Sequence, residues 1–174
     1  RALRAAEVDR RGAQARAIDD NLSHQLLGAY NAMRSMRERY AAWGPVELQT
    51  TAVRRMGALV GAMPGVRAMA LVGPDGRVLA SNVVSQAGRD VSRTEAFRRA
   101  RERADAGVVI LAPPAEVEPG VRASTLALAI VGPDGAFGGV VTATLDPGYF
   151  EVALRSALYA PDMWAAVVHA EGDV

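Results

Sequence analysis

The chain has 174 residues, of which 50% are hydrophobic and 22% charged, a length and balance typical of a folded domain with its own core rather than of a disordered segment. Its net charge of +1 provides no general attraction to nucleic acid or to an acidic membrane surface. The sequence has no Cys and no Lys, which excludes disulfides, thiolate metal sites, cysteine nucleophiles, Schiff-base lysines and the P-loop lysine.

The two ends of the sequence indicate a piece of a longer protein. No apolar run approaches the roughly 20 residues of a membrane span, and no signal peptide is found. The chain begins with Arg1 rather than Met and ends at Val174, inside a segment, AAVVHAEGDV, that resembles a strand and turn. We therefore expect a membrane anchor and an output domain to lie outside these residues.

The first forty residues predict a long helix, because they are rich in helix formers and contain one glycine before Gly28. From residue 22 onward, apolar residues follow the 4-3 spacing of a helical stripe: Leu22, Leu26, Ala29, Met33, Met36, Tyr40 and Trp43. Such a stripe can pack against its own domain or against the same helix of a second chain. The spacing alone leaves both possibilities open.

The remainder of the chain predicts an α+β domain. WGP at 43–45 ends the first helix, and Pro45 suits the first turn of a second one that ends near MPG at 63–65. Further helices are expected over 93–104 and after Pro147, and three prolines within 112–121 predict a mobile loop. Segments rich in strand formers lie at 66–72, 77–81, 107–111, 123–131 and 137–145. This order favours an antiparallel sheet built on hairpins and packed against helices.

The pentapeptide VGPDG occurs twice, at 72–76 and 131–135, and each copy predicts a tight hairpin turn. If Pro133 and Asp134 are the two central residues, Val131 lies opposite Ala136. One face of this hairpin then carries Ala123, Thr125, Ala127, Ala129, Gly138, Val140, Thr142 and Thr144. The other carries Leu126, Leu128, Ile130, Phe137, Val141 and Leu145. We predict that the large apolar face covers the long helix. The small face either borders a shallow cavity or packs closely under the helix of 93–104.

Two motifs connect the chain to a known family. The first is G-x-D-x-S followed by F-R-x-A, within 88–100, and the second is DG-x-F-x-G-V-V-x-A-x-L-D-P-x-Y-F, at 134–150. Together with the order of elements, they resemble the PAS-like extracytoplasmic sensor domains called PDC or Cache, especially those that precede diguanylate cyclase and histidine kinase domains. The resemblance covers nearly the whole chain. It implies a PAS-like five-stranded antiparallel sheet with a long N-terminal helix (1–43) and a sensor module (44–174) that we expect to be truncated at its C-terminus.

The resemblance also implies where a ligand would bind. Amino-acid sensors of the family carry a ligand-binding Arg and aromatic residue where this sequence, aligned on Ser92 and Phe97, has Thr94 and Ala96, so amino-acid sensing is not supported. Asp146 matches an Asp that holds the ligand ammonium in those sensors, but it also suits a helix N-cap. We expect a small carboxylate or neutral polar ligand, with Arg93 or Arg122 as the anion contact. The candidate binding residues are Arg93, Phe97, Arg122, Thr125, Thr142, Thr144 and Asp146.

Other arrangements of reactive residues give no site. Asp20 and His24 lie one helical turn apart, but two ligands are too few for a metal and His169 is remote in sequence. Arginines in 89–103 alternate with acidic residues, which favours a solvated helix face over an anion site. No nucleophile and base are grouped together. We therefore predict no catalytic residue, no metal, no cofactor and no nucleic-acid partner.

Three functions follow from these observations. The resemblance implies an extracytoplasmic, periplasmic ligand-sensing input domain of an inner-membrane receptor, a diguanylate cyclase or histidine kinase, that forms a homodimer through the long helix. The alternative is a structural dimerisation module whose pocket is vestigial. A small enzyme is least favoured because acid, base and nucleophile groups are missing.

Overall fold

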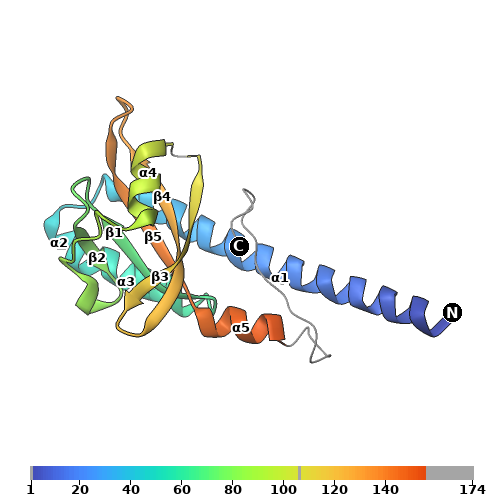
Figure 1. Cartoon of the computed structure of the whole chain (residues 1–174). Helices are drawn as coiled ribbons and strands as arrows, with labels where there is room; N and C mark the ends of the chain where they lie inside the picture. Colours follow the sequence, from blue (N-terminus) through green and yellow to red (C-terminus); the bar gives the residue numbers. More distant parts are fainter. Residues whose placement is uncertain (1, 106, 156–174) are drawn as a thin grey trace.

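The protein, described here by a computed structural model over residues 2–105 and 107–155, consists of a twisted sheet with helices on both faces (Figure 1). The sheet has five antiparallel strands in the order β2-β1-β5-β4-β3. The strands are β1 Val66–Val72, β2 Val78–Ser81, β3 Val109–Glu118, β4 Val121–Val131 and β5 Phe137–Leu145. This arrangement confirms the α+β, five-stranded antiparallel prediction. The predicted strand at 165–174, with His169, lies outside the described residues.

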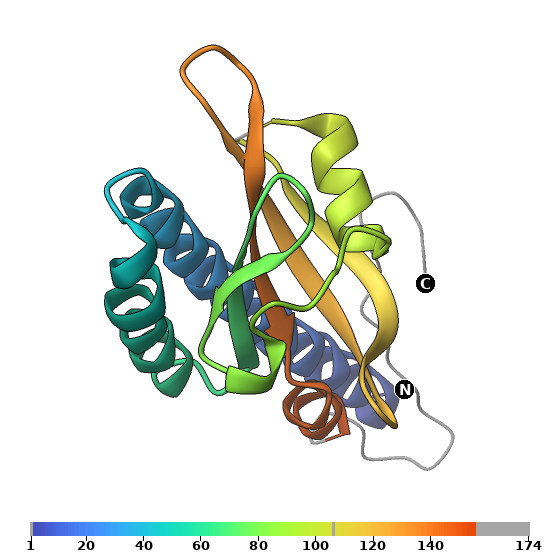
Figure 2. The same cartoon turned by 90° about the vertical axis from the view of Figure 1, so that its left-hand side faces the viewer.

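The helices form the layers outside the sheet. They are α1 Ala2–Tyr40, α2 Pro45–Glu47, α3 Val53–Gly61, α4 Glu95–Arg103 and α5 Pro147–Arg155, with a π-helical turn at Leu48–Ala52 and a 3₁₀ turn at Val84–Gln86. The predicted second helix is therefore divided into α2, the π-helical turn and α3. Figure 2 shows α1 and α3 on one side of the sheet and α4 on the other. The first of these sides is called the helix face below, and the second the pocket face.

The helix face holds the larger apolar core, as the alternation of residues predicted. Met33 and Met36 of α1 have no exposed surface and pack in one cluster with Leu128 of β4 and Val141 of β5. Ala29 is equally buried in this cluster. The apolar stripe of α1 thus packs on the sheet of its own chain from Ala29 to Met36. A dimer contact made by Met33 or Met36 is inconsistent with this burial, and the part of α1 that precedes the core extends past the sheet (Figure 1).

Both VGPDG segments form tight hairpin turns with the same hydrogen bonds. The N–H of Gly76 donates to the carbonyl of Gly73 at 3.0 Å, and the N–H of Gly135 donates to that of Gly132 at 2.9 Å. Gly76 and Gly135 have φ of 84° and 79°, values that glycine adopts without the steric cost paid by other residues. Each turn is therefore a three-residue loop that ends in a left-handed glycine.

The predicted register of the second hairpin is wrong at the turn, because the loop has three residues instead of two. Val131 lies opposite Phe137 rather than Ala136, and a second shift between Ile130 and Val131 moves the pairing by one more residue. Two one-residue shifts restore the predicted faces, so Ala129 pairs with Val140 on the pocket face. Phe137 pairs with Val131, on the turn side of the second shift, so only the first shift affects it. Its side chain packs on the pocket face instead of the expected helix face.

The segment 112–121 is not the loop that its prolines predicted. β3 continues through Pro113 and Pro114 to Glu118, and β4 already begins at Val121. β3 is an edge strand, and its pairing with β4 is irregular between Ala112 and Ala115. Proline lacks an N–H donor, so strands tolerate it at edges and irregularities such as this one. The extended β3–β4 hairpin reaches over the pocket face.

Candidate ligand-binding site

A pocket of about 190 Å³ lies on the pocket face of the sheet. Its floor comes from four strands, one wall comes from the segment between β2 and α4, and the other comes from residues 112–117 of β3. The floor residues are Ala70, Val72, Val78, Ala123, Thr125, Thr142 and Thr144. Small side chains on the sheet leave this space open. The small face of the hairpin therefore borders a cavity here, rather than packing closely under α4 over its whole length.

Three threonines give the floor its polar character. Thr125 and Thr144 are paired directly across β4 and β5, and Thr142 lies two residues before Thr144 on the same face. Thr144 is only 8% exposed. None of the three hydroxyls makes a hydrogen bond with any residue of the described chain. Each can therefore both donate to and accept from a molecule in the pocket.

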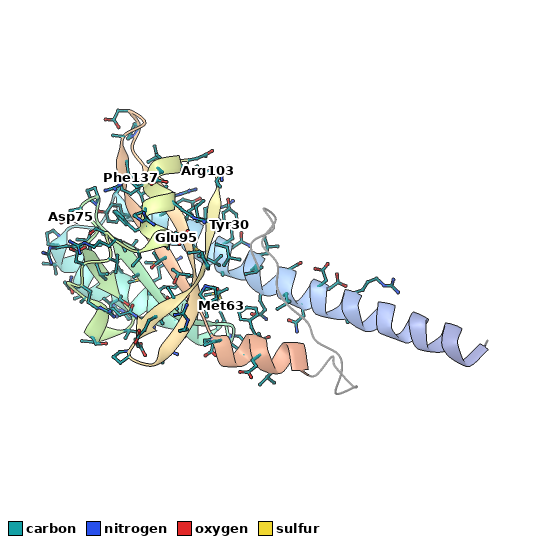
Figure 3. All side chains as sticks on the ribbon, viewed as in Figure 1. Tyr30, Met63, Asp75, Glu95, Arg103 and Phe137 are labelled. Atoms are coloured by element: carbon teal, nitrogen blue, oxygen red, sulfur yellow. The ribbon has the colours of Figure 1, made fainter. Side chains whose placement is uncertain are left out.

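Phe97 forms the apolar wall at the start of α4. Its side chain is 1% exposed and meets Phe137 edge to face, with ring centroids 5.7 Å apart. Phe137 lies close to α4 in Figure 3, and the guanidinium of Arg101 lies 5.6 Å from the Phe97 ring centroid. Thr94 precedes α4 as its N-cap, accepting from the Phe97 N–H at 3.4 Å and donating to the Val91 carbonyl at 2.7 Å. Its hydroxyl is thus already used by the backbone.

The G-x-D-x-S motif attaches this wall to the first hairpin. The N–H of Gly88 donates to the Val78 carbonyl at 2.8 Å, and the N–H of Val91 donates to the Gly76 carbonyl at the same distance. Asp90 accepts from the Ser92 N–H at 2.9 Å. Hydrogen bonds from Ser92, and then the charges of Arg77 and Arg93, lower the pKa of Asp90 below its usual 3.8. The motif therefore shapes the pocket wall through backbone contacts.

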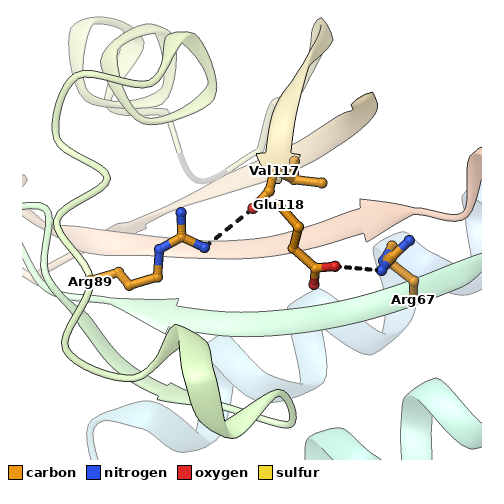
Figure 4. A network of polar contacts seen from close by, with 4 residues as sticks. All are labelled: Arg67, Arg89, Val117 and Glu118. Atoms are coloured by element: carbon orange, nitrogen blue, oxygen red, sulfur yellow. Dashed lines mark hydrogen bonds and ion pairs between the residues drawn. The ribbon is translucent and has the colours of Figure 1, made fainter. Parts of the chain in front are cut away.

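Charged side chains lie at the edge of the pocket, where β3 meets the wall. The Nη1 of Arg89 donates to the Val117 carbonyl at 3.2 Å, and Arg67 of β1 pairs with Glu118 at 2.8 Å (Figure 4). Glu95 and Glu116 also line the pocket. Glu95 pairs with Arg99 at 2.7 Å, and Glu116 accepts from the Gly120 N–H at 3.1 Å.

Four of the seven residues selected from the sequence line the pocket: Phe97, Thr125, Thr142 and Thr144. Arg93, Arg122 and Asp146 do not. Arg93 is exposed. The Nη2 of Arg122 donates to the Pro114 carbonyl at 2.8 Å. Asp146 accepts from the Tyr149 N–H at 3.0 Å, as the N-cap of α5 would.

Sequence reasoning missed Arg89, Gln86 and Glu116, which do line the pocket. Arg89 lies inside the G-x-D-x-S motif, but nothing in the spacing indicated that its side chain would turn toward β3. The alignment did provide one usable signal. Thr94 and Ala96, the residues that replace the family's Arg and aromatic, both line the pocket.

Comparison with solved structures identifies the architecture. The extracellular domain of a protein assigned as a histidine kinase, rpHK1S-Z16, superimposes with a TM-score of 0.76 at 22% identity, over 89% of this chain and 63% of that one. The Campylobacter jejuni chemoreceptor Tlp3 sensory domain with isoleucine bound gives 0.65 at 12% identity, over 87% and 64%. The fold is that of a PDC/Cache sensor domain. The histidine kinase DctB sensor domain from V. cholerae gives a TM-score of 0.57 at 16% identity, over 86% and 57%.

This chain spans less than two thirds of the length of each of these structures. No family model matches it, and no curated protein does. Within residues 2–105 and 107–155, no helix is both long and apolar enough to cross a membrane. The same residues contain no cluster of three or more His, Cys, Asp or Glu side chains suited to a metal ion.

Proposed function

We propose that the chain is the extracytoplasmic ligand-sensing input domain of a membrane-anchored bacterial receptor with a histidine kinase or diguanylate cyclase output. The observation that carries this proposal is the pocket, which is lined mostly by apolar residues and by three threonines whose hydroxyls have no partner in the described chain. A mostly apolar cavity with a few convergent polar groups is typical of small-molecule sites. Domains of the same fold support it, since Tlp3 has been solved with isoleucine bound and the Pseudomonas aeruginosa chemoreceptor PctC with GABA.

The sheet connects this pocket to the long helix. On β5, Val141 packs in the core beneath α1, while the next residue, Thr142, lines the pocket on the opposite face. A ligand that moves β5 therefore acts on strand residues that also contact α1. The ligand shifts the equilibrium between two positions of α1 only by the difference between its affinities for them.

A thermal-shift screen of metabolites tests the sensing function, because a ligand that binds only the folded state raises the melting temperature. Ligands that bind in the pocket should lose at least part of their shift in Thr125→Val and Thr144→Val. Arg93→Ala serves as a control, since its side chain is exposed and does not line the pocket. If no metabolite raises the melting temperature, the alternative of a structural module with a vestigial pocket is favoured.

The proposed receptor is a homodimer through the part of α1 that extends past the sheet. Within the described residues, Ala13, Ala17 and Asp20 of this part are exposed, whereas Met33 and Met36 are buried. Cysteines placed along residues 13–24 of the full-length receptor should form disulfides with a helical period of three to four residues. If no cysteine in this range crosslinks while the receptor is correctly inserted in its membrane, α1 does not form the dimer contact.

A further inference from the structure

We infer that the pocket binds a small carboxylate without an amino group, with Arg89 as the anion contact. This inference rests on the proposed sensing function and specifies its ligand class. It follows from the charges that line the pocket: one cation without an acidic partner, one carboxylate paired with an arginine and one that accepts from a backbone N–H.

Arg89 is the one basic residue among those lining the pocket in the described part of the chain. Its only side-chain hydrogen bond there is from Nη1 to the Val117 carbonyl, a neutral acceptor 3.2 Å away at the edge of an exposed site. A guanidinium has five N–H donors in a planar fork that matches a carboxylate. Most of these donors remain available to a ligand.

Two hydrogen bonds hold the backbone of Arg89, whereas one hydrogen bond holds its side chain. The Arg89 carbonyl accepts from the Val78 N–H at 2.9 Å, and its N–H donates to the Gln86 carbonyl at 3.1 Å. The Cα is thus fixed to β2 at the edge of the pocket. Turning the guanidinium from the Val117 carbonyl to a ligand carboxylate replaces a neutral acceptor with an anionic one that can accept two parallel N–H bonds.

The two acidic residues of the pocket are poorly placed to bind an ammonium group. Glu95 is paired with Arg99, one helical turn along α4. Glu116 accepts from the Gly120 N–H at the turn of the hairpin and lies opposite Arg122 in the register. Asp146, the remaining candidate for an ammonium, caps α5 and does not line the pocket. A ligand ammonium would therefore compete with Arg99 for Glu95 and with the Gly120 N–H for Glu116.

The size and floor of the pocket narrow the ligand further. A volume of about 190 Å³ equals the space of about six water molecules, which suits an acid of about three to five carbons. The free hydroxyls of Thr125, Thr142 and Thr144 can donate to, or accept from, a hydroxyl or keto oxygen. The N-terminal turn of α4, whose Glu95 and Ala96 line the pocket, adds a positive helix end that favours an anion.

Calorimetric titration with matched compounds tests the inference. Lactate and malate present a carboxylate and a hydroxyl, alanine and aspartate replace that hydroxyl with an ammonium, and lactamide removes the negative charge of lactate. We expect at least one hydroxy acid to bind, and to bind at least ten times more tightly than its amino counterpart. Lactamide should bind at least ten times more weakly than lactate if lactate is the acid that binds.

Substitutions then locate the anion contact. Arg89→Gln should weaken binding of the acid by about ten- to hundredfold, the loss expected for a hydrogen bond to a charged group. Arg89→Lys should restore part of it, and Arg93→Gln, an exposed arginine of the same segment, should leave it unchanged. Melting temperatures of Arg89→Gln and Arg93→Gln that equal that of the parent chain would show that the fold is intact.

Two results would overturn the inference. One is tighter binding of alanine or aspartate than of the hydroxy acids, and the other is unchanged acid binding in Arg89→Gln. Both leave the sensing function standing, because a ligand still binds. If none of the five compounds binds, the proposed ligand class is wrong, and the metabolite screen decides separately whether the domain senses anything.

Discussion

Ser92 occupies the space where a side chain at Gly76 would lie. A Cβ built on Gly76 falls 2.6 Å from the Cα of Ser92 and 2.8 Å from its nitrogen, both closer than side chains approach a backbone. This contact joins the turn of the first hairpin to the segment that forms the pocket wall. Gly135, the equivalent glycine of the second VGPDG turn, has nothing within 4 Å of its Cβ position.

The two glycines therefore predict different costs for the same substitution. Gly135→Ala should destabilise the domain by about 1 kcal/mol, because only the left-handed backbone is unfavourable for alanine. Gly76→Ala should cost about 3 kcal/mol, because overpacking against the Ser92 backbone is added. Denaturant unfolding of both variants measures the difference. Equal losses would show that Ser92 does not lie against the turn.

Leu128 tests the assignment of the helix face. Its side chain has no exposed surface and packs between the sheet and α1, so Leu128→Asp places a charge in the core without a partner and should unfold the domain. Val84→Asp, at a residue 84% exposed, is the matched control and should melt close to the parent chain. Circular dichroism melts compare the two, and a folded Leu128→Asp variant would contradict the assignment.

Arg55 and Ser35 test the polar contact between α3 and α1. The Nη2 of Arg55 donates to the Ser35 hydroxyl at 2.7 Å, while the buried Nε has no partner in the described chain. Ser35→Ala leaves a second N–H donor of the guanidinium without a partner, and should lower the free energy of unfolding by about 1 to 3 kcal/mol. Arg55→Met removes the polar group altogether and should cost less than Ser35→Ala. Chemical denaturation ranks the two, and the opposite order would show that the pair is net stabilising.

Asp90 should make the pocket wall sensitive to acid. Its pKa is lowered in the folded state, chiefly by hydrogen bonds from Ser92, so the stabilisation from its charge is present above its unfolded pKa, near 3.8. That stabilisation disappears as the pH falls through the lower folded pKa. Asp90→Asn keeps an oxygen acceptor but does not titrate. The melting-temperature difference between parent and variant should therefore be constant at neutral pH and shrink below about pH 4. A difference independent of pH would contradict the role of the charge.

The sequence by itself determined the features that depend on neighbouring residues. Alternation of side chains placed Leu128 and Val141 on one face of the sheet and Thr125, Thr142 and Thr144 on the other, because successive residues of a strand point in opposite directions. Local chemistry also predicted the glycine turns and the N-cap at Asp146. These preferences act over a few residues and need no knowledge of the rest of the chain.

Only the tertiary structure decided which distant segments meet. It placed the double proline of 113–114 on an edge strand, where a missing N–H donor is tolerated, and it packed Met33 and Met36 of the apolar stripe on their own sheet. It also brought Arg89, rather than Arg93 or Arg122, to the pocket. All three are arginines in polar segments, so composition does not distinguish them. Their side chains differ only in the surfaces they reach, and those surfaces are set by the order and register of strands far apart in the sequence.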